Sequence, residues 1–496
     1  MSVIVRRILF TVTALAGVIG LILYIQSLGG RIPRIEVIGP EVTTGPLRIA
    51  PIRFAQTDFY VYPTRVDAEL GHLSTPLFHQ TSRPERVTLR FVRFAATTSH
   101  PGPPVVYLAG GPGGSGIVSA SGDRFPFFMA LREVGDVIAL EIRGVGPSSR
   151  RFCPGKWSYP LDHEFDEALL SRLKGDYLQS CWENLKDPDG LSAFNTRESA
   201  ADLEDLRIAL GAPQLNLVGI SYGTHLALAY LRQYPDRVAG AVLAGVEGPD
   251  HTYKSPAVVE SVIREIDRTL EEEAGWTGFV ADFEQALEKL RQQPARVEIQ
   301  HPRTDDLVEV EVGALDLQRA VYFGLGERED FLRVARRVRN IAEGSYRDLA
   351  RLAIRTRSAR GYSVMPLSVD CASGVSAARR QRIAQEAAGS FLGNVPNLSL
   401  TSTCAYWPVS DLGEVYRGPV TADVPILAVS GTLDPRTPPS QAEEVLLGFT
   451  RGRHLKIVGG GHDDDLLITS GRIVVEMAQF LKTSEIATEK IVLPRL

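Results

Sequence analysis

The feature that most constrains the fold is the segment LNLVGISYG, Leu215–Gly223. It contains the only Gly-x-Ser-x-Gly match in the sequence, with Ser221 between Gly219 and Gly223. An apolar run precedes the match and apolar residues at helical spacing follow it, which predicts a strand, a tight turn and a helix. Because this turn is strained, the flanking glycines, which have no Cβ, are needed. The context predicts that Ser221 is a nucleophile at the start of a helix, where the helix dipole favours negative charge.

Strand and helix patterns alternate around this segment. Buried strands are predicted at Val105–Leu108, Asp136–Ser148 (ending in a loop), Val238–Gly248, Val424–Gly431 and His454–Gly460, and amphipathic helices at Asn195–Ala212 and Ser470–Thr483. This alternation predicts an α/β fold with a doubly wound, mostly parallel sheet. The expected sheet domain is formed by residues 51–249 and 416–496.

The pattern changes at about Asp250, where charged amphipathic helices replace the alternation. A hairpin is predicted at Arg296–Val312, and no buried strand follows until residue 424. We therefore expect residues 250–415 to form a mainly helical cap inserted into the sheet domain.

The N-terminus differs in kind from the rest. After Arg6 and Arg7 the segment Ile8–Ile25 is uncharged, long enough for a short membrane-spanning helix, and no small-x-small cleavage site follows it. Residues 1–30 are predicted to be a signal anchor, with a cleaved signal peptide as the alternative, and residues 31–50 a linker. Either reading places the main domain outside the cytoplasm, in the cell envelope or secreted.

The chain has four cysteines, Cys153, Cys181, Cys371 and Cys404. None has C-x-x-C spacing, so no zinc site is expected. In an exported protein an even number indicates disulfides. Of three possible pairings we favour the local one, Cys153–Cys181 and Cys371–Cys404, which keeps each bridge within one region.

A serine nucleophile needs a base, and the base needs an orienting acid. Asp434 and His462 each follow a predicted strand, at the edge where parallel sheets build their sites. We predict that His462 is the base and Asp434 the acid, with Glu247, at the end of another strand, as the alternative acid. The three aspartates after His462 are expected to be solvated.

Acyl transfer also needs hydrogen-bond donors for the oxyanion. We predict the amide of Tyr222, after the nucleophile, and the amide of Gly111, in the glycine-rich loop after Val105–Leu108. That loop lacks G-x-G-x-x-G spacing and a P-loop lysine, so phosphate or nucleotide binding is not indicated and no cofactor is expected. The net charge of −5 with no long basic run makes nucleic acid an unlikely partner class.

Several motifs together resemble the prolyl aminopeptidase and tripeptidyl aminopeptidase family of α/β hydrolases. They are GGPGGSG (residues 110–116), EIRGVGPS (141–148), DLEDLRIALG (202–211), GISYG with the helix after it, GTLDPRTP and GGGH. The resemblance implies the α/β-hydrolase fold, the triad Ser221, Asp434 and His462, cleavage of an N-terminal peptide bond, and an exported location. The chain departs from the family where Leu108 and Ala109 precede the glycines and where Glu141 and Ile142 replace Asp and Gln before Arg143.

An aminopeptidase also needs a carboxylate to bind the cationic α-amine of its substrate, and Glu247, followed by Asp250, is the candidate by position. The leading hypothesis is an aminopeptidase that acts on peptides through an acyl-enzyme. The alternatives are a carboxylesterase that uses the same triad on a small acyl substrate, and a non-catalytic binding protein on the same fold. The sequence predicts neither the substrate nor the oligomeric state.

Overall fold

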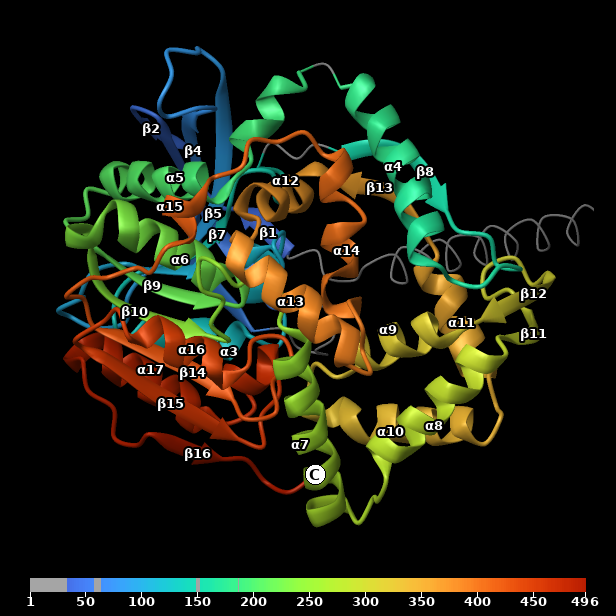
Figure 1. Ribbon diagram of the computed structural model, residues 1–496. Helices are drawn as coiled ribbons and strands as arrows, with labels where there is room; N and C mark the ends of the chain where they lie inside the picture. Colours follow the sequence, from blue (N-terminus) through green and yellow to red (C-terminus); the bar gives the residue numbers. More distant parts are fainter. Residues whose placement is uncertain (1–33, 58–63, 149–151, 186) are drawn as a thin grey trace, which may run out of the picture.

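The computed structural model describes residues 34–57, 64–148, 152–185 and 187–496. The predicted signal anchor, residues 1–30, lies outside these ranges. Among the described residues, no helix is both long enough and apolar enough to cross a membrane. Figure 1 shows a sheet flanked by helices on the left and a mostly helical region on the right.

In the described part of the chain, twelve strands form one sheet in the order β1-β3-β4-β5-β7-β6-β9-β10-β14-β15-β16, with β2 beside β3. Pairings from β1 to β7 are antiparallel, and those from β7 to β16 are parallel. The carboxyl ends of the parallel strands therefore meet at one edge. The strands are β1 Arg34–Val37, β2 Val42–Thr44, β3 Leu47–Ala55, β4 Arg65–Pro76, β5 Arg86–Phe94, β6 Val105–Leu108, β7 Val137–Glu141, β9 Leu215–Ile220, β10 Val238–Ala244, β14 Ile426–Gly431, β15 Gly452–Val458 and β16 Lys490–Val492.

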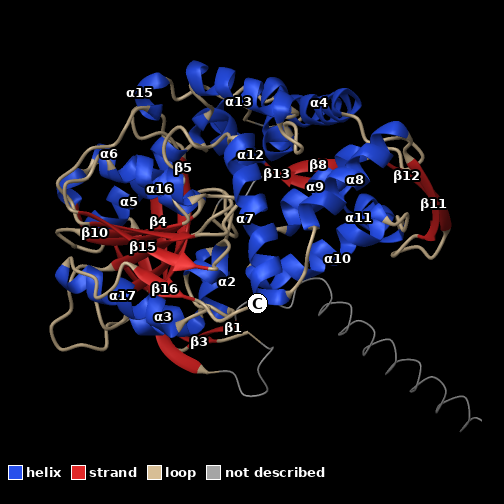
Figure 2. Cartoon of the chain, turned by 60° about the horizontal axis from the view of Figure 1, so that its bottom comes forward, coloured by secondary structure: helices blue, strands red, loops and turns tan. Residues whose placement is uncertain are grey.

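Strand alternation divides the apolar side chains of this sheet between two faces. Val106 and Leu108 of β6 pack in one buried cluster with α5, α6 and α16, whereas Val105 and Tyr107 pack in another with α2, α3 and α17. Figure 2 shows α5, α6 and α16 on one side of the sheet and α3 and α17 on the other. The helices are α2 Gly116–Ser121, α3 Phe125–Leu131, α5 Thr196–Ala209, α6 Tyr222–Gln233, α16 Pro439–Leu446 and α17 Gly471–Thr483. The predicted α/β architecture is confirmed. The predicted linker at residues 31–50 is wrong for residues 34–50, because β1, β2 and the start of β3 lie there and pair within the sheet.

The helix ends follow the local sequence. The side chain of Asn195 accepts a hydrogen bond from the amide of Glu198 and caps α5. Ser255 caps α7, Pro256–Ala274, in the same way, and Pro256 occupies the first position of that helix. That helix ends at Gly275, which has a left-handed φ of 65°.

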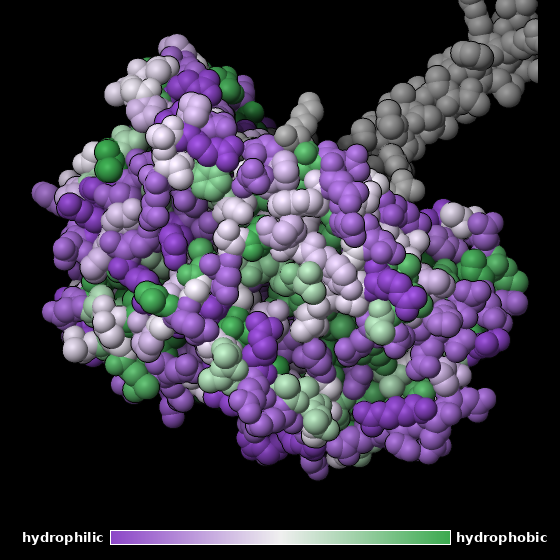
Figure 3. Space-filling model, turned by 45° about the horizontal axis from the view of Figure 1, so that its top comes forward, coloured by the Kyte–Doolittle hydropathy of each residue, from purple (hydrophilic) through white to green (hydrophobic). Residues whose placement is uncertain are grey.

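Most of the chain between β10 and β14 is helical. It contains α7 Pro256–Ala274, α8 Phe279–Gln292, α9 Ala314–Gly324, α10 Phe331–Ala342, α11 Arg347–Thr356, α12 Val364–Ser373, α13 Ala377–Gly389, α14 Leu398–Thr401 and α15 Glu414–Arg417. β11 Ala295–Gln300 and β12 Leu307–Val312 pair antiparallel, which confirms the predicted hairpin. The helices enclose a buried apolar cluster of their own. On the face drawn in Figure 3, hydrophilic residues predominate and hydrophobic ones lie in small groups.

The segment after β7 leaves the sheet and joins the helical region. β8, Phe152–Ser158, pairs antiparallel with β13, Ser358–Ser363, and α4, Glu167–Glu183, follows it. The disulfide Cys153–Cys181 ties β8 to α4, and Cys371–Cys404 ties α12 to the chain after α14. Both predicted pairings are confirmed, and the strand pairing joins segments about two hundred residues apart.

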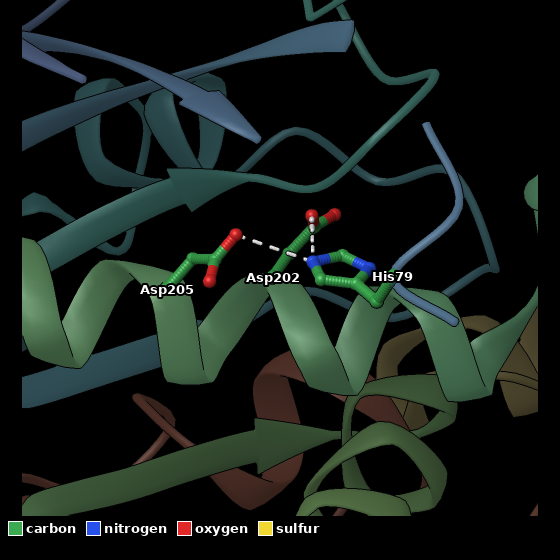
Figure 4. A group of neighbouring side chains, drawn as sticks. All are labelled: His79, Asp202 and Asp205. Carbon is green, nitrogen blue, oxygen red and sulfur yellow. Dashed lines mark hydrogen bonds and ion pairs between the residues drawn. The ribbon is translucent and has the colours of Figure 1, made fainter. Parts of the chain in front are cut away.

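An ionic cluster fastens the loop after β4 to α5 (Figure 4). His79 Nδ1 lies 2.6 Å from Glu198 Oε2, and Nε2 lies 3.2 Å from Asp205 Oδ2. The buried Arg143 guanidinium donates two hydrogen bonds of 2.7 Å to Asp202, beside the same imidazole. Burial alone would lower the pKa of His79, but the hydrogen bonds with Asp205 and Glu198 outweigh burial and raise it to about 9. At neutral pH the imidazole is therefore protonated and balances the carboxylates.

This cluster predicts a pH-dependent contribution to stability. Because the folded-state pKa of His79 lies above its ordinary value of 6.5, the stabilisation is complete below pH 6.5 and is lost as the pH rises through about 9. His79→Gln should lower the free energy of unfolding by roughly 2–3 kcal/mol at pH 6 and by much less at pH 9.5. Urea denaturation of both proteins across this range measures the difference. The exposed His100→Gln is the control, and a difference for His79 that does not change with pH contradicts the prediction.

Candidate active site

Ser221 is the single residue between β9 and α6, and its backbone is strained. Its φ of 53° and ψ of −122° lie in a region that side chains other than glycine rarely adopt. A Cβ at Gly219 would lie 2.6 Å from the carbonyl oxygen of Gly223, and one at Gly223 would lie 2.0 Å from that of Leu108. Both flanking glycines are therefore required by close backbone contacts, and the turn holds the serine side chain out at the carboxyl edge of the sheet.

Asp434 and His462 are brought together from the loops after β14 and β15. His462 Nδ1 lies 2.8 Å from Asp434 Oδ2, and the Asp434 side chain is completely buried. The other oxygen, Oδ1, accepts hydrogen bonds from the amides of Arg436 (2.7 Å) and Thr437 (3.0 Å), and the Thr437 hydroxyl donates to Oδ2 at 2.6 Å. Burial would raise the pKa of Asp434, but His462 and the Thr437 hydrogen bonds outweigh it and lower that pKa. The carboxylate is thus ionised and orients the imidazole.

One cavity of about 630 Å³, here called the Ser221 cavity, is lined by Ser221, His462, Gly110, Gly111 and Glu247, among others. A Cβ at Gly110 would lie 3.1 Å from Ser221 Cβ, so the glycine loop passes directly against the serine. The predicted nucleophile, base and oxyanion loop therefore line the same cavity, and the predicted acid is buried and contacts the base.

Glu247 follows β10 and lines the Ser221 cavity as a buried, ionised carboxylate. Its Oε2 accepts a hydrogen bond of 2.6 Å from Lys254 Nζ. Burial would raise the pKa of Glu247, but Lys254 and His225 outweigh it and lower that pKa. Among the described residues no ion pair joins Glu247 to His462, so the acid position beside the histidine belongs to Asp434.

Asp250 is placed differently from Glu247. Its two carboxylate oxygens accept hydrogen bonds from the amide (2.7 Å) and the hydroxyl (2.6 Å) of Ser376, the residue that caps α13. It is not among the residues that line the Ser221 cavity. Asp250 therefore stabilises the N-terminus of α13.

Asp370, on α12, is a carboxyl group that the sequence analysis missed. Burial, followed by the negative charge of Glu247, raises the pKa of Asp370 well above its usual range. No motif marks this residue, since its proximity to Glu247 arises only when α12 packs over the carboxyl edge of the sheet.

The loop after α9 holds the His462 loop in place. The amide of His462 donates to the carbonyl of Gly326 at 2.8 Å, and Asp465 Oδ2 accepts from the amide of Arg328 at 2.8 Å. Glu327 accepts hydrogen bonds from the amides of Asp464 (3.1 Å) and Asp465 (3.3 Å). Burial, together with the negative charges of these aspartates, raises the pKa of Glu327 to about 8. The helical region thus contributes directly to the position of the histidine.

The expectation that the three aspartates after His462 are solvated is wrong for Asp465, which is only 3% exposed. Asp463 and Asp464 are more exposed but form ion pairs with Arg124, next to α3. The folded loop is contacted from two sides, by Arg124 and by the segment that contains Glu327 and Arg328.

One group of described side chains has the spacing of metal ligands. The ligand atoms of His79, Asp202 and Asp205 lie within 4.8 Å of one another. None of them lines the Ser221 cavity, and Arg143 and the protonated His79 already balance the carboxylates. We assign this group no catalytic role.

The fold and this arrangement identify the class. Residues 103–464 match the model of the alpha/beta hydrolase fold family, and the chain belongs to that family.

Two relatives found by sequence have names that agree with the resemblance that the motifs predict. The tripeptidyl aminopeptidase of Streptomyces coelicolor is 28% identical over 199 residues, which cover 36% of this chain and 35% of that protein. The match thus spans about a third of the length of that relative. The serine protease Hip1 of Mycobacterium tuberculosis is 26% identical over 461 residues, covering 81% of this chain and 84% of that protein. Among solved structures, the proline iminopeptidase of Mycobacterium smegmatis aligns with 83% of this chain and 98% of its own, at 14% identity and a TM-score of 0.41.

The contact between the helical region and the His462 loop predicts a positioning effect. Asp465 Oδ2 accepts hydrogen bonds from the amides of Gly461 and Arg328, each at 2.8 Å. Asp465→Asn replaces one charged acceptor with a donor and should displace the loop. We expect kcat to fall roughly tenfold with a smaller change in KM, because misplacement of a catalytic group weakens the transition state more than binding.

Steady-state kinetics on any cleaved substrate test this, together with the melting temperature of the variant. The exposed Asp423→Asn makes the same chemical change at a distance from the loop and is the control. A fall confined to KM, or equal falls in both variants, contradicts the positioning effect.

Proposed function

We propose that the protein is a serine hydrolase, and specifically an aminopeptidase that works through an acyl-enzyme. The observation that carries the proposal is that Ser221, in a strained turn, lines the same cavity as His462, whose Nδ1 contacts the buried Asp434. Such a serine is activated by a neighbouring imidazole, which an ionised carboxylate holds in the correct tautomer.

In the proposed reaction Ser221 Oγ attacks the scissile carbonyl carbon and His462 Nε2 takes the hydroxyl proton. Asp434 stabilises the imidazolium that forms. The amides of Tyr222 and Gly111 donate to the oxyanion of the tetrahedral intermediate. His462 then gives the proton to the leaving amine, and a water molecule, activated by the same imidazole, hydrolyses the acyl-enzyme.

Specificity for a free N-terminus is proposed to come from Glu247, which lines the Ser221 cavity. Glu247 is ionised but shares its charge with Lys254, so an incoming ammonium meets only part of a negative charge there.

The alternative is a carboxylesterase with the same triad. The distinguishing feature is the buried Glu247–Lys254 pair on the cavity wall, since an uncharged acyl substrate makes no use of a buried carboxylate. This pair favours the aminopeptidase.

The remaining organisation is proposed from the sequence together with the helical region. We propose that residues 250–415 form a cap over the Ser221 cavity, since Lys254, Tyr322, Gly326 and Glu327 line it. We also propose that residues 1–30 anchor the protein in a membrane or direct its export, with the catalytic domain outside the cytoplasm. The two disulfides support an oxidising compartment.

The first test is a substrate screen. Peptides with free and with blocked N-termini, and matched amides and esters, are offered to the wild-type protein and to Ser221→Ala. We expect cleavage of amide bonds next to free N-termini, reduced by roughly a million-fold in the variant. Activity only on blocked esters would overturn the aminopeptidase in favour of the esterase, and failure of Ser221 to react with a fluorophosphonate would overturn both.

The second test concerns amine recognition. Glu247→Gln should lower kcat/KM about a hundredfold on peptides with a free N-terminus, because a buried ammonium then loses its charged partner. On a neutral ester substrate the variant should lose much less. Glu288→Gln, on the exposed face of α8, is the control. An equal loss on both substrate classes indicates a structural role for Glu247 and contradicts amine binding.

A further inference from the structure

Arg436 is a cavity residue that the proposed reaction does not use. It lies two positions after Asp434, on the loop that follows β14, and its side chain lines the Ser221 cavity together with Ser221 and His462. The Arg436 amide donates to Asp434 Oδ1 at 2.7 Å. The backbone of this residue therefore supports the acid, while its side chain is available for another role.

The guanidinium of Arg436 is held in a defined position against α9. It lies 4.6 Å from the ring centre of Tyr322 and 5.2 Å from that of Phe323. Its Nη2 also donates to the carbonyl oxygen of Phe323 at 3.1 Å. Stacking on aromatic rings and one hydrogen bond restrict the rotamers of a long side chain, so less entropy remains to be lost on binding a ligand.

Among the described residues, the guanidinium of Arg436 has no carboxylate partner. The two other arginine and lysine side chains that line the cavity have carboxylate partners: Arg124 pairs with Asp463 and Asp464, and Lys254 pairs with Glu247. Arg436, in contrast, forms no ion pair with any carboxylate in the described ranges, and its contacts are two rings and one carbonyl oxygen. A half-buried, preorganised and uncompensated guanidinium presents donors that match a carboxylate.

We propose that Arg436 forms a carboxylate-binding subsite of the Ser221 cavity, which selects substrates that carry a carboxylate near the scissile bond. The inference rests on the proposed function only in taking a peptide bond as the bond that is cleaved. The carboxylate subsite itself is argued from the contacts of Arg436. With Glu247 on the same cavity, the substrate class is a short zwitterionic peptide with an ammonium group at one end and a carboxylate toward the other.

The carboxylate has two possible sources, the C-terminus of a short peptide or the side chain of an Asp or Glu residue in a longer one. A comparison of peptides that end in a free acid with peptides that end in a carboxamide tests the first source, the C-terminal carboxylate. Peptides with Glu or Gln in the residue after the scissile bond, both with an amidated C-terminus, separate the second.

The experiment compares kcat/KM for these pairs in the wild-type protein, Arg436→Gln and Arg436→Lys. The wild-type protein should prefer the carboxylate member of at least one pair by roughly tenfold. Arg436→Gln should abolish that preference. Arg436→Lys, which keeps the charge but loses the planar fork, should retain part of it. Arg472→Gln, on the exposed part of α17, removes the same charge elsewhere and should leave the preference intact.

Because the readout is a ratio within one variant, a general loss of folding or of catalysis does not alter it. Equal losses on the charged and neutral members of both pairs would show that Arg436 only tethers α9 to the loop after β14, and would overturn the subsite. If the wild-type protein cleaves esters but no peptides, the proposed aminopeptidase fails. The same ratio, measured with acidic and neutral esters, then still confirms or overturns the subsite.

Discussion

The structure depends most on the contact between Asp434 and His462, made by two loops at the carboxyl edge of the sheet. His462 Nδ1 lies 2.8 Å from Asp434 Oδ2, and the two loops come this close because β14 and β15 are adjacent and parallel. The contact also requires that the buried carboxylate be compensated, which Thr437 and two backbone amides accomplish. Burial excludes water from this pair, so each remaining hydrogen bond has a larger effect on the orientation of the imidazole. The orientation of His462 therefore depends both on the pairing of the strands and on the polar contacts of the Asp434 loop.

The helical region is coupled to this contact rather than merely placed above it. The loop after α9 holds the His462 loop through Gly326, Glu327 and Arg328, and the same helix supplies the rings under the Arg436 guanidinium. A shift of α9 would therefore displace both the His462 loop and the guanidinium of Arg436. This gives a physical route by which the region that shapes the cavity also affects the reacting groups.

Much of the fold could be predicted because its signals are local. The strand, turn and helix around Ser221, the N-cap at Asn195 and the hairpin of β11 and β12 each depend on neighbouring residues, and the structure has all of them. Both disulfide pairings also proved local in sequence. The pairing of β8 with β13 could not be predicted, because it joins segments whose patterns are separately weak.

The sequence by itself determined which loops follow the parallel strands, and hence that Ser221, His462 and the two candidate acids, Asp434 and Glu247, lie at one edge of the sheet. It did so because strand period, glycine positions and chain order are properties of short segments. Only the tertiary structure decided which charges remain uncompensated. Glu247 faces Lys254, Asp250 faces Ser376 and Arg436 faces aromatic rings, and nothing in the spacing of these residues distinguishes the three outcomes. The electrostatics of the cavity depend on how distant helices pack over the sheet, and packing is a property of the whole chain.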